Sequence, residues 1–167
     1  MSHFEQNEPE LLLETLDFQA LVSEVIASMK LRFEKQTAHV GFESSGSIFM
    51  VNGDRMHLAS VVYNLLDNAL KYSPGQPEID VRLFSEGNEL KLEVADRGIG
   101  IAPEHRERIF EKFYRVPTGN VHNVKGHGLG LSYVASVVQK HGGRVAVGDG
   151  KMGGSVFVIT LNLTTGI

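Results

Sequence analysis

The spacing of apolar residues changes repeatedly along this chain, and those changes restrict the folds that it can adopt. The segments 18–34, 55–72 and 130–141 each show the three-to-four-residue repeat of an amphipathic helix. Short strand-forming runs lie around them, at 11–16, 39–43, 48–51, 79–84, 90–95, 144–148 and 155–163. Several neighbouring strands are joined by hairpin turns. The pattern predicts an α+β fold, a two-layer sandwich with a mixed, mostly antiparallel sheet and about three helices on one face.

Local signals set the bounds of these elements. Asp17 and Asp54 are predicted to be the N-caps of the first two helices, and Asn52-Gly53 is predicted to be a turn. Residues 1–10 are polar and have no period, so we interpret them as a tail or a linker remnant. Residues 11–167 are expected to form one domain.

Composition excludes several classes of protein. The chain has 16 Lys and Arg against 20 Asp and Glu, a net charge of −4, which argues against a nucleic-acid partner. It has no cysteine, so thiolate zinc sites and cysteine nucleophiles are excluded. No apolar run approaches the ~20 residues of a membrane span. We therefore expect a cytoplasmic domain with no direct membrane contact.

The second predicted helix carries a polar face opposite its apolar stripe. Asn64, Asn68 and Lys71 recur at i, i+4 and i+7, which places them on one side of the helix. Amide oxygens and an ammonium suit Mg²⁺ with a polyphosphate, because Mg²⁺ prefers oxygen ligands and shares its shell with phosphates. The alternative is a solvated face on which these side chains pair with charged neighbours.

Two glycine motifs are candidates for ligand binding. In Asp96-Arg97-Gly98-Ile99-Gly100-Ile101, the acid could accept a hydrogen bond from an amine such as that of adenine, and the glycines would admit a flat ring. The alternative there is an Asx turn. In Lys125-Gly126-His127-Gly128-Leu129-Gly130-Leu131, alternating glycines lead into a helix N-terminus, whose N–H groups can hold phosphate. The alternative there is a flexible loop.

The segment Ile109-Phe110-Glu111-Lys112-Phe113-Tyr114-Arg115 lies between these motifs. Its aromatic residues could wall an adenine pocket, and its arginine could reach a terminal phosphate. The alternative is a short amphipathic helix that packs Phe110 and Phe113 into the core. Both interpretations can hold together. Residues 116–124 are polar and rich in turn formers, as a lid requires.

In order and spacing, these segments resemble the N, G1, F and G2 boxes of sensor histidine kinases. They read Asn64-Leu65-Leu66-Asp67-Asn68-Ala69-Leu70-Lys71-Tyr72-Ser73, Asp96-x-Gly98-x-Gly100, Phe110-x-x-Phe113-Tyr114-Arg115 and Gly126-x-Gly128-Leu129-Gly130-Leu131. Residues 11–163 are thus similar to the ATP-binding catalytic domain of the GHKL superfamily, which has the Bergerat fold. The F box favours the kinase branch of that superfamily.

The resemblance implies ATP and Mg²⁺ as ligands and gives each matching residue a role. Asn64 and Asn68 would hold Mg²⁺, and Asp96 would accept the adenine amino group. Lys71 and Arg115 would contact phosphates as the catalytic residues. The nucleotide would be bound by Asn64, Asn68, Lys71, Tyr72, Asp96, Gly98, Gly100, Ile101, Phe113, Gly126, Gly128, Leu129, Gly130 and Leu131.

The resemblance also implies a reaction, the transfer of the γ-phosphoryl group of ATP to a histidine on a separate helical domain. None of the seven histidines here lies in such an acceptor motif, so the chain is not expected to autophosphorylate alone. The implied partners are the phosphoacceptor dimerisation helices of a membrane-anchored parent kinase and a downstream response regulator. Two alternatives stay open: a non-catalytic module that responds to ATP or ADP, and an anti-sigma-type serine kinase with the same fold.

Overall fold

The computed structural model describes residues 10–47, 49–112, 114, 130–151 and 153–164. The α-helices in this part of the chain are α2 (Phe18–Ser28), α3 (Lys30–Lys35), α4 (Arg55–Lys71) and α5 (Gly130–Lys140). The strands are β1 (Glu14–Asp17), β2 (His39–Ser45), β3 (Met50–Gly53), β4 (Glu78–Glu86), β5 (Glu89–Asp96), β6 (Arg144–Asp149) and β7 (Ser155–Asn162). Two short 3-10 helices, η1 (Pro103–His105) and η2 (Arg108–Phe110), follow β5.

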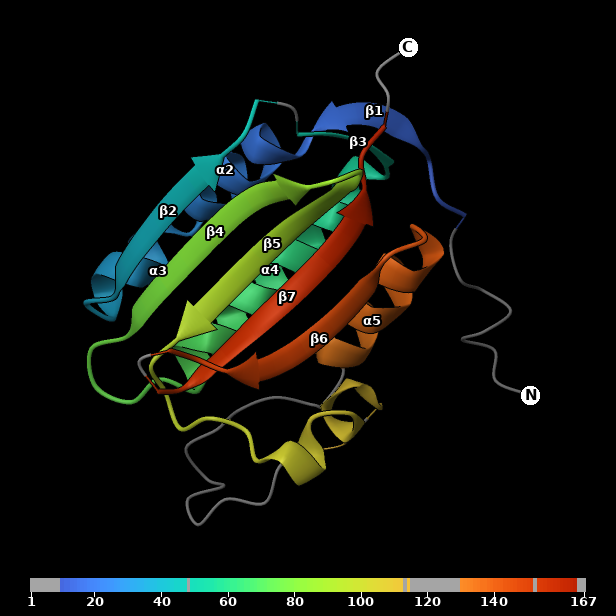
Figure 1. The fold of residues 1–167 in the computed structure, drawn as a ribbon. Coiled ribbons are helices and arrows are strands. Elements are labelled where there is room, and N and C mark those ends of the chain that lie inside the picture. The colour runs from blue at the N-terminus through green and yellow to red at the C-terminus, as the bar shows by residue number, and fades with distance from the viewer. Residues whose placement is uncertain (1–9, 48, 113, 115–129, 152, 165–167) are drawn as a thin grey trace.

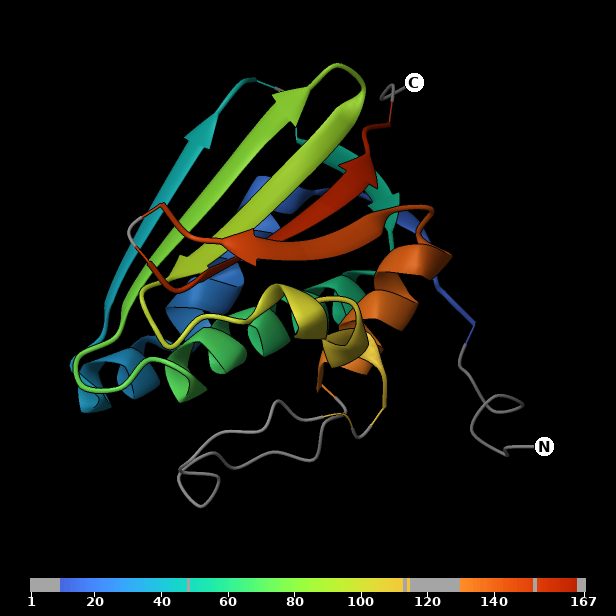
Figure 2. The ribbon, with the colours of Figure 1, turned by 60° about the horizontal axis from the view of Figure 1, so that its bottom comes forward.

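Five strands form the main sheet in the order β2-β4-β5-β7-β6, and β1 pairs with β3 in a small second sheet. In the main sheet β2 runs parallel to β4, while the pairs β4–β5, β5–β7 and β6–β7 are antiparallel. Figures 1 and 2 show α2, α4 and α5 packed on one face of this sheet. The predicted fold class is confirmed. None of the described helices has the length and apolarity that crossing a membrane requires.

Helix α4 lies at the centre of the helical layer and fixes the position of the candidate site. Its apolar stripe is buried, as the periodicity predicts, and consists of Leu58, Val61, Val62, Leu65, Leu66, Ala69 and Leu70. Both predicted N-caps are confirmed, since Asp17 accepts the N–H of Gln19 at 3.0 Å and Asp54 accepts that of His57 at 3.1 Å. The stripe and the cap together fix which face of α4 remains polar.

Three local predictions are wrong. The helix predicted over 18–34 is two helices, because the chain leaves the helical conformation at Met29, where ψ is 4°. The predicted turn at Asn52-Gly53 is the end of β3, and the first strand is Glu14–Asp17 rather than 11–16. The last two errors have one cause: β1 and β3 pair with each other, which keeps Asn52 and Gly53 extended. That pairing joins segments distant in sequence.

Candidate functional site

The polar face of α4 lies opposite the buried stripe, where the spacing places it. Asn64 and Asn68 are half-buried, and Lys71 is exposed. The Asn64 Nδ2 donates to the carbonyl of Ser60 at 2.7 Å, so Oδ1 is the oxygen of this amide that could accept from a ligand. A Cβ at Gly130 would lie 3.0 Å from this oxygen. The structure therefore brings a predicted metal ligand next to the first residue of α5.

Lys71 forms an ion pair within the protein. Its Nζ lies 3.0 Å from Oδ2 of Asp67, and a guanidinium nitrogen of Arg32 lies 2.7 Å from Oδ1 of the same carboxylate. This is the pairing with charged neighbours that was the alternative to phosphate binding. A polyphosphate would therefore compete with Asp67 for the Lys71 ammonium.

Asp96 ends β5 in a buried position, with 4% of its surface exposed. Its Oδ1 accepts hydrogen bonds from the N–H groups of Gly98 at 2.8 Å and Ser155 at 3.3 Å. Burial raises the pKa of the Asp96 carboxyl above its ordinary value, and these two hydrogen bonds offset only part of the effect. The Asx turn is present, and it occupies only one oxygen of the acid.

The end of α4 meets the turn after β5, which joins the first two predicted motifs. The N–H of Ile99 donates to the carbonyl of Tyr72 at 3.2 Å. A Cβ at Gly98 would lie 2.0 Å from that carbonyl oxygen, so only glycine fits there. The neighbouring Ser73 hydroxyl is buried and has no hydrogen-bond partner among the described residues. A buried hydroxyl of this kind is available to a water or a ligand.

A hollow of about 540 Å³ lies beside the same turn. Its lining includes Gly100 and Ile101 of the predicted site, and an ion pair of 2.5 Å between Arg106 and Asp149 at its margin. The predicted α4 residues and Asp96 are not in its lining. Arg106 also donates to the carbonyl of Ile101 at 3.3 Å, which holds the turn against η1.

Ile109, Phe110 and Tyr114, which follow η1, pack onto the core. Ile109 is buried, and the ring of Phe110 meets that of Phe157 edge-to-face with centroids 6.2 Å apart. The Tyr114 hydroxyl contacts Nδ1 of His105, and the Arg108 guanidinium lies 4.5 Å from the centre of the Tyr114 ring. Core packing of Phe110, the alternative for this motif, is therefore present.

Five predicted site residues lie outside the described part of the chain: Phe113, Arg115, Gly126, Gly128 and Leu129. Gly130 and Leu131 are the first residues of α5. Among the described residues no group of three or more His, Asp or Glu side chains could hold a metal ion. A cation here would depend on the amides of α4 and on oxygens that a ligand supplies.

Sequence reasoning missed two contributors, one at the start of β7 and one in the turn before it. Ser155 donates to Asp96, and Gly154, at φ +73°, lies so close that a Cβ would come within 2.1 Å of the Asp96 carbonyl. The consecutive glycines 153 and 154 before a strand were the available signal. Their place beside Asp96 follows from the pairing of β5 with β7.

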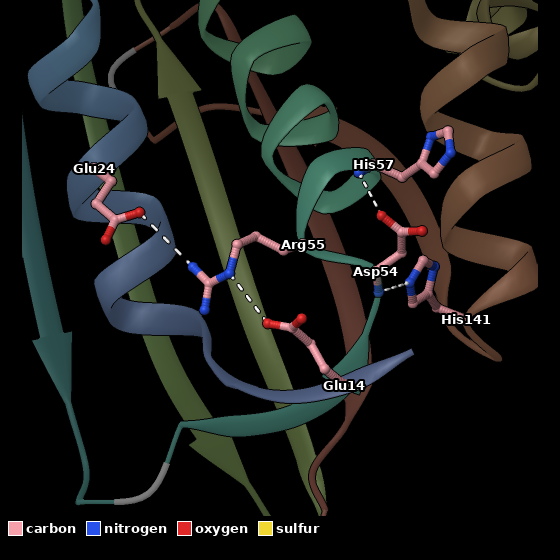
Figure 3. Close-up of polar contacts among 6 residues, drawn as sticks. All are labelled: Glu14, Glu24, Asp54, Arg55, His57 and His141. Atoms are coloured by element: carbon pink, nitrogen blue, oxygen red, sulfur yellow. Dashed lines mark hydrogen bonds and ion pairs between the residues drawn. The ribbon is translucent and has the colours of Figure 1, made fainter. Parts of the chain in front are cut away.

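A second polar cluster lies at the other end of α4 (Figure 3). The buried Asp54 accepts the N–H of Leu12 on Oδ2 at 2.8 Å and that of His57 on Oδ1 at 3.1 Å. Its own N–H donates to Nε2 of His141 at 3.0 Å, while Nδ1 of His141 bonds the carbonyl of Val137 at 2.8 Å. A neutral imidazole with its proton on Nδ1 satisfies both contacts.

Arg55 extends this cluster toward α2. Its guanidinium lies 3.2 Å from Glu14 and 3.8 Å from Glu24, as Figure 3 shows. These exposed pairs connect β1, α2 and α4, and each contributes at most about 1 kcal/mol. None of the residues in this cluster belongs to the predicted site.

Comparisons with known proteins agree with this fold. Residues 53–165 match the family described as histidine kinase-, DNA gyrase B- and HSP90-like ATPases. The chain therefore belongs to this family of ATPases.

Sequence relatives point to a narrower class within this family, the sensor histidine kinases. Sensor protein RprX of Bacteroides fragilis is 36% identical over 165 residues, which cover 98% of this chain and 32% of the relative. The histidine-protein kinase/phosphatase MprB of Mycolicibacterium vanbaalenii is 36% identical over 135 residues, 80% of this chain and 28% of the relative. The chain thus spans about a third of the length of the curated relatives it matches.

Solved structures give the same result. A mycobacterial sensor histidine kinase MprB has a TM-score of 0.78 at 30% identity, over 90% of this chain and 97% of that chain. The catalytic domain of histidine kinase ThkA has a TM-score of 0.79 at 24% identity, over 90% of this chain and 95% of that chain, which supports the fold alone. The prediction of a histidine kinase ATP-binding catalytic domain is confirmed, and these comparisons favour neither alternative.

Proposed function

We propose that this domain binds Mg²⁺–ATP at the junction of α4, the Asp96 turn and the start of α5, and donates the γ-phosphoryl group to a histidine on a separate helical domain. The observation that carries the proposal is this junction. It combines a buried acid bonded on one oxygen, glycines in close contact with backbone, and Asn64 beside Gly130. The acid suits the amino edge of a purine, the glycines admit its flat ring, and Asn64 beside the start of α5 suits a polyphosphate with its cation.

The base would be recognised through Asp96. Both internal donors bond to Oδ1, so Oδ2 is the oxygen that would accept the adenine amino group. Gly98, Gly100 and Ile101 would line the base, with Tyr72 and Phe113 beside it. The unpartnered Ser73 hydroxyl lies at the same junction and offers a further polar contact.

The phosphates would be held at the other side of the junction. Asn64 and Asn68 fit Mg²⁺ because their amide oxygens are hard donors and need few protein neighbours when phosphates complete the shell. Mg²⁺ would supply charge neutralisation on the phosphates. Lys71 and Arg115 would contact phosphates, and Gly126, Gly128, Leu129, Gly130 and Leu131 would present backbone N–H groups. Catalysis would then consist mainly of positioning and electrostatic stabilisation.

Two related structures support the ligand and the partner. The full-length kinase ShkA, 28% identical to this chain, was solved in complex with AMPPNP. The kinase ThkA, whose likeness at 22% identity concerns the fold, was solved in complex with a response regulator protein. We extend both interactions to this chain, within a parent kinase that carries the phosphoacceptor helices and a membrane anchor.

The test is phosphoryl transfer from γ-labelled ATP. The chain is incubated with Mg²⁺, labelled ATP and the phosphoacceptor helices of a related kinase such as MprB, and with the same helices carrying His→Gln at the acceptor. We expect acid-labile label on the unmodified helices alone. ATP binding without transfer would indicate a nucleotide-responsive module, and acid-stable label on serine would indicate a serine kinase.

A further inference from the structure

A hydrogen bond between two side chains connects α4 to α5 next to the proposed phosphate site. His57, Ser60 and Asn64 lie on one face of α4, at i, i+3 and i+7. The Tyr133 hydroxyl of α5 lies 2.6 Å from Nδ1 of His57, within hydrogen-bond distance. Two turns along the same face of α4, Nδ2 of Asn64 donates to the Ser60 carbonyl at 2.7 Å.

These contacts fix the position of the first turn of α5 relative to the Asn64 side chain. Tyr133 lies one helical turn after Gly130, so anchoring Tyr133 anchors the first turn of α5. The bond from Nδ2 to Ser60 fixes the orientation of the Asn64 amide, and Oδ1 then lies beside Gly130. The distance from this oxygen to the N-terminus of α5 therefore depends on how Tyr133 is held.

We propose that Tyr133, held by His57, is a positioning residue that sets the Asn64 carbonyl oxygen against the N-terminus of α5 for joint binding of Mg²⁺ and phosphate. This inference rests on the proposed function. The physical reason is the narrow tolerance of Mg²⁺, which holds oxygen ligands at about 2.1 Å in near-octahedral geometry. A small shift of α5 along α4 would separate the amide ligand from the backbone donors that face the same polyphosphate.

The position of Tyr133 distinguishes this role from ordinary packing. The side chain is half-buried, and the rings of Tyr133 and His57 are 5.9 Å apart and tilted by 42°, so their main contact is the hydrogen bond and not ring stacking. Removing the hydroxyl leaves the ring in place. Loss of the Tyr133 hydroxyl should therefore change the Mg²⁺-dependent affinity for ATP more than the free energy of unfolding.

The experiment compares Tyr133→Phe with Tyr63→Phe in the whole chain. Tyr63 is a matched control because its hydroxyl also bonds a neighbouring helix, to Arg32 of α3 at 2.9 Å, on the exposed side of α4. Calorimetry gives the Kd of ATP in excess Mg²⁺ and in EDTA, and thermal unfolding gives Tm. We expect Tyr133→Phe to lose about tenfold of the Mg²⁺-dependent affinity, with small changes in EDTA affinity and Tm. Tyr63→Phe should retain that affinity.

A second pair of variants tests the partner. His57→Asn keeps a polar atom near the position of Nδ1, and His57→Leu removes it. We expect the Leu variant to match Tyr133→Phe and the Asn variant to recover most of the Mg²⁺-dependent affinity. Failure of Asn to recover it would contradict the hydrogen-bonded role.

The outcomes separate this inference from the proposed function. If the wild-type chain binds no ATP, the proposed function fails before any variant is made. If it binds ATP equally well with Mg²⁺ and with EDTA, or if Tyr133→Phe lowers both affinities and Tm together, ATP binding stands and the positioning role is overturned.

Discussion

Asp54 and Asp96 lie near opposite ends of α4 and are both 4% exposed, yet their pKa values move in opposite directions. Burial acts to raise the pKa of each. At Asp54, hydrogen bonds from the N–H groups of Leu12 and His57, together with the electrostatic effect of His57, outweigh burial, so the pKa of Asp54 is lowered. At Asp96 two such bonds do not outweigh it, and the pKa of Asp96 is raised.

The difference follows how completely each carboxylate is hydrogen-bonded within the described part of the protein. Asp54 has both oxygens bonded within the protein and also caps α4. Asp96 receives its internal bonds on one oxygen, and the nearby Ser73 hydroxyl has no partner among the described residues. At the Asp54 end, both carboxylate oxygens have hydrogen-bond partners within the protein, and they support the fold. The other end retains a carboxylate oxygen that the proposed adenine contact would use, at a cost in stability that is common at binding sites.

Asp96→Asn gives the largest expected effect and tests the binding end. The donors of Gly98 and Ser155 require an oxygen, so the asparagine NH₂ must face the adenine amino group, donor against donor. We expect ATP affinity, measured by calorimetry, to fall about 100- to 1000-fold. Tm at pH 7 should rise by a few degrees, because a desolvated charge is removed. Unchanged affinity would contradict the assignment of Asp96 to adenine.

Asp54→Ala tests the structural end and should have a smaller effect. It removes the cap of α4 and leaves the N–H of Leu12 without its acceptor, so we expect a loss of roughly 1–3 kcal/mol in the free energy of unfolding. Chemical denaturation measures it. Asp54→Asn, which can still cap, is the control and should lose less. If Asp54→Ala reduced the free energy of ATP binding by more than the free energy of unfolding, the assignment of Asp54 to a structural role would be contradicted.

The pH dependence of stability gives the smallest expected effect. A lowered pKa at Asp54 stabilises the fold above the ordinary carboxyl pKa, and this contribution is lost as pH falls through the lowered pKa. A raised pKa at Asp96 acts oppositely: its penalty exists at neutral pH and is relieved as pH falls below the raised pKa.

Tm profiles of the wild type and the two Asn variants measure this difference. From pH 7 downward, the gap between Asp96→Asn and the wild type should close first. The gap between Asp54→Asn and the wild type should persist to lower pH. If both gaps closed over the same pH range, the pKa values of Asp54 and Asp96 would not be shifted in opposite directions.

Much of the candidate site could be predicted from sequence because its signals are local. Asn64, Asn68 and Lys71 share a face of α4 through helix geometry alone, and Asp54 shows the sequence of a cap. The Asp96 turn likewise follows from one acid and a glycine two residues later. The partners from other elements could not be predicted: Asp67, which pairs with Lys71 one turn away on α4, is also contacted by Arg32 of α3.

Sequence by itself determined the α+β class, the buried stripe of α4, the caps and the order of the motifs, because periodicity and capping act over a few residues. Only the tertiary structure decided that β2 pairs in parallel with β4 and that β1 pairs with β3. It also decided that Ser155 bonds to Asp96, that His141 bonds to Asp54 and that Tyr133 bonds to His57. These contacts join residues distant along the chain, and their geometry depends on how the sheet and helices pack as a whole.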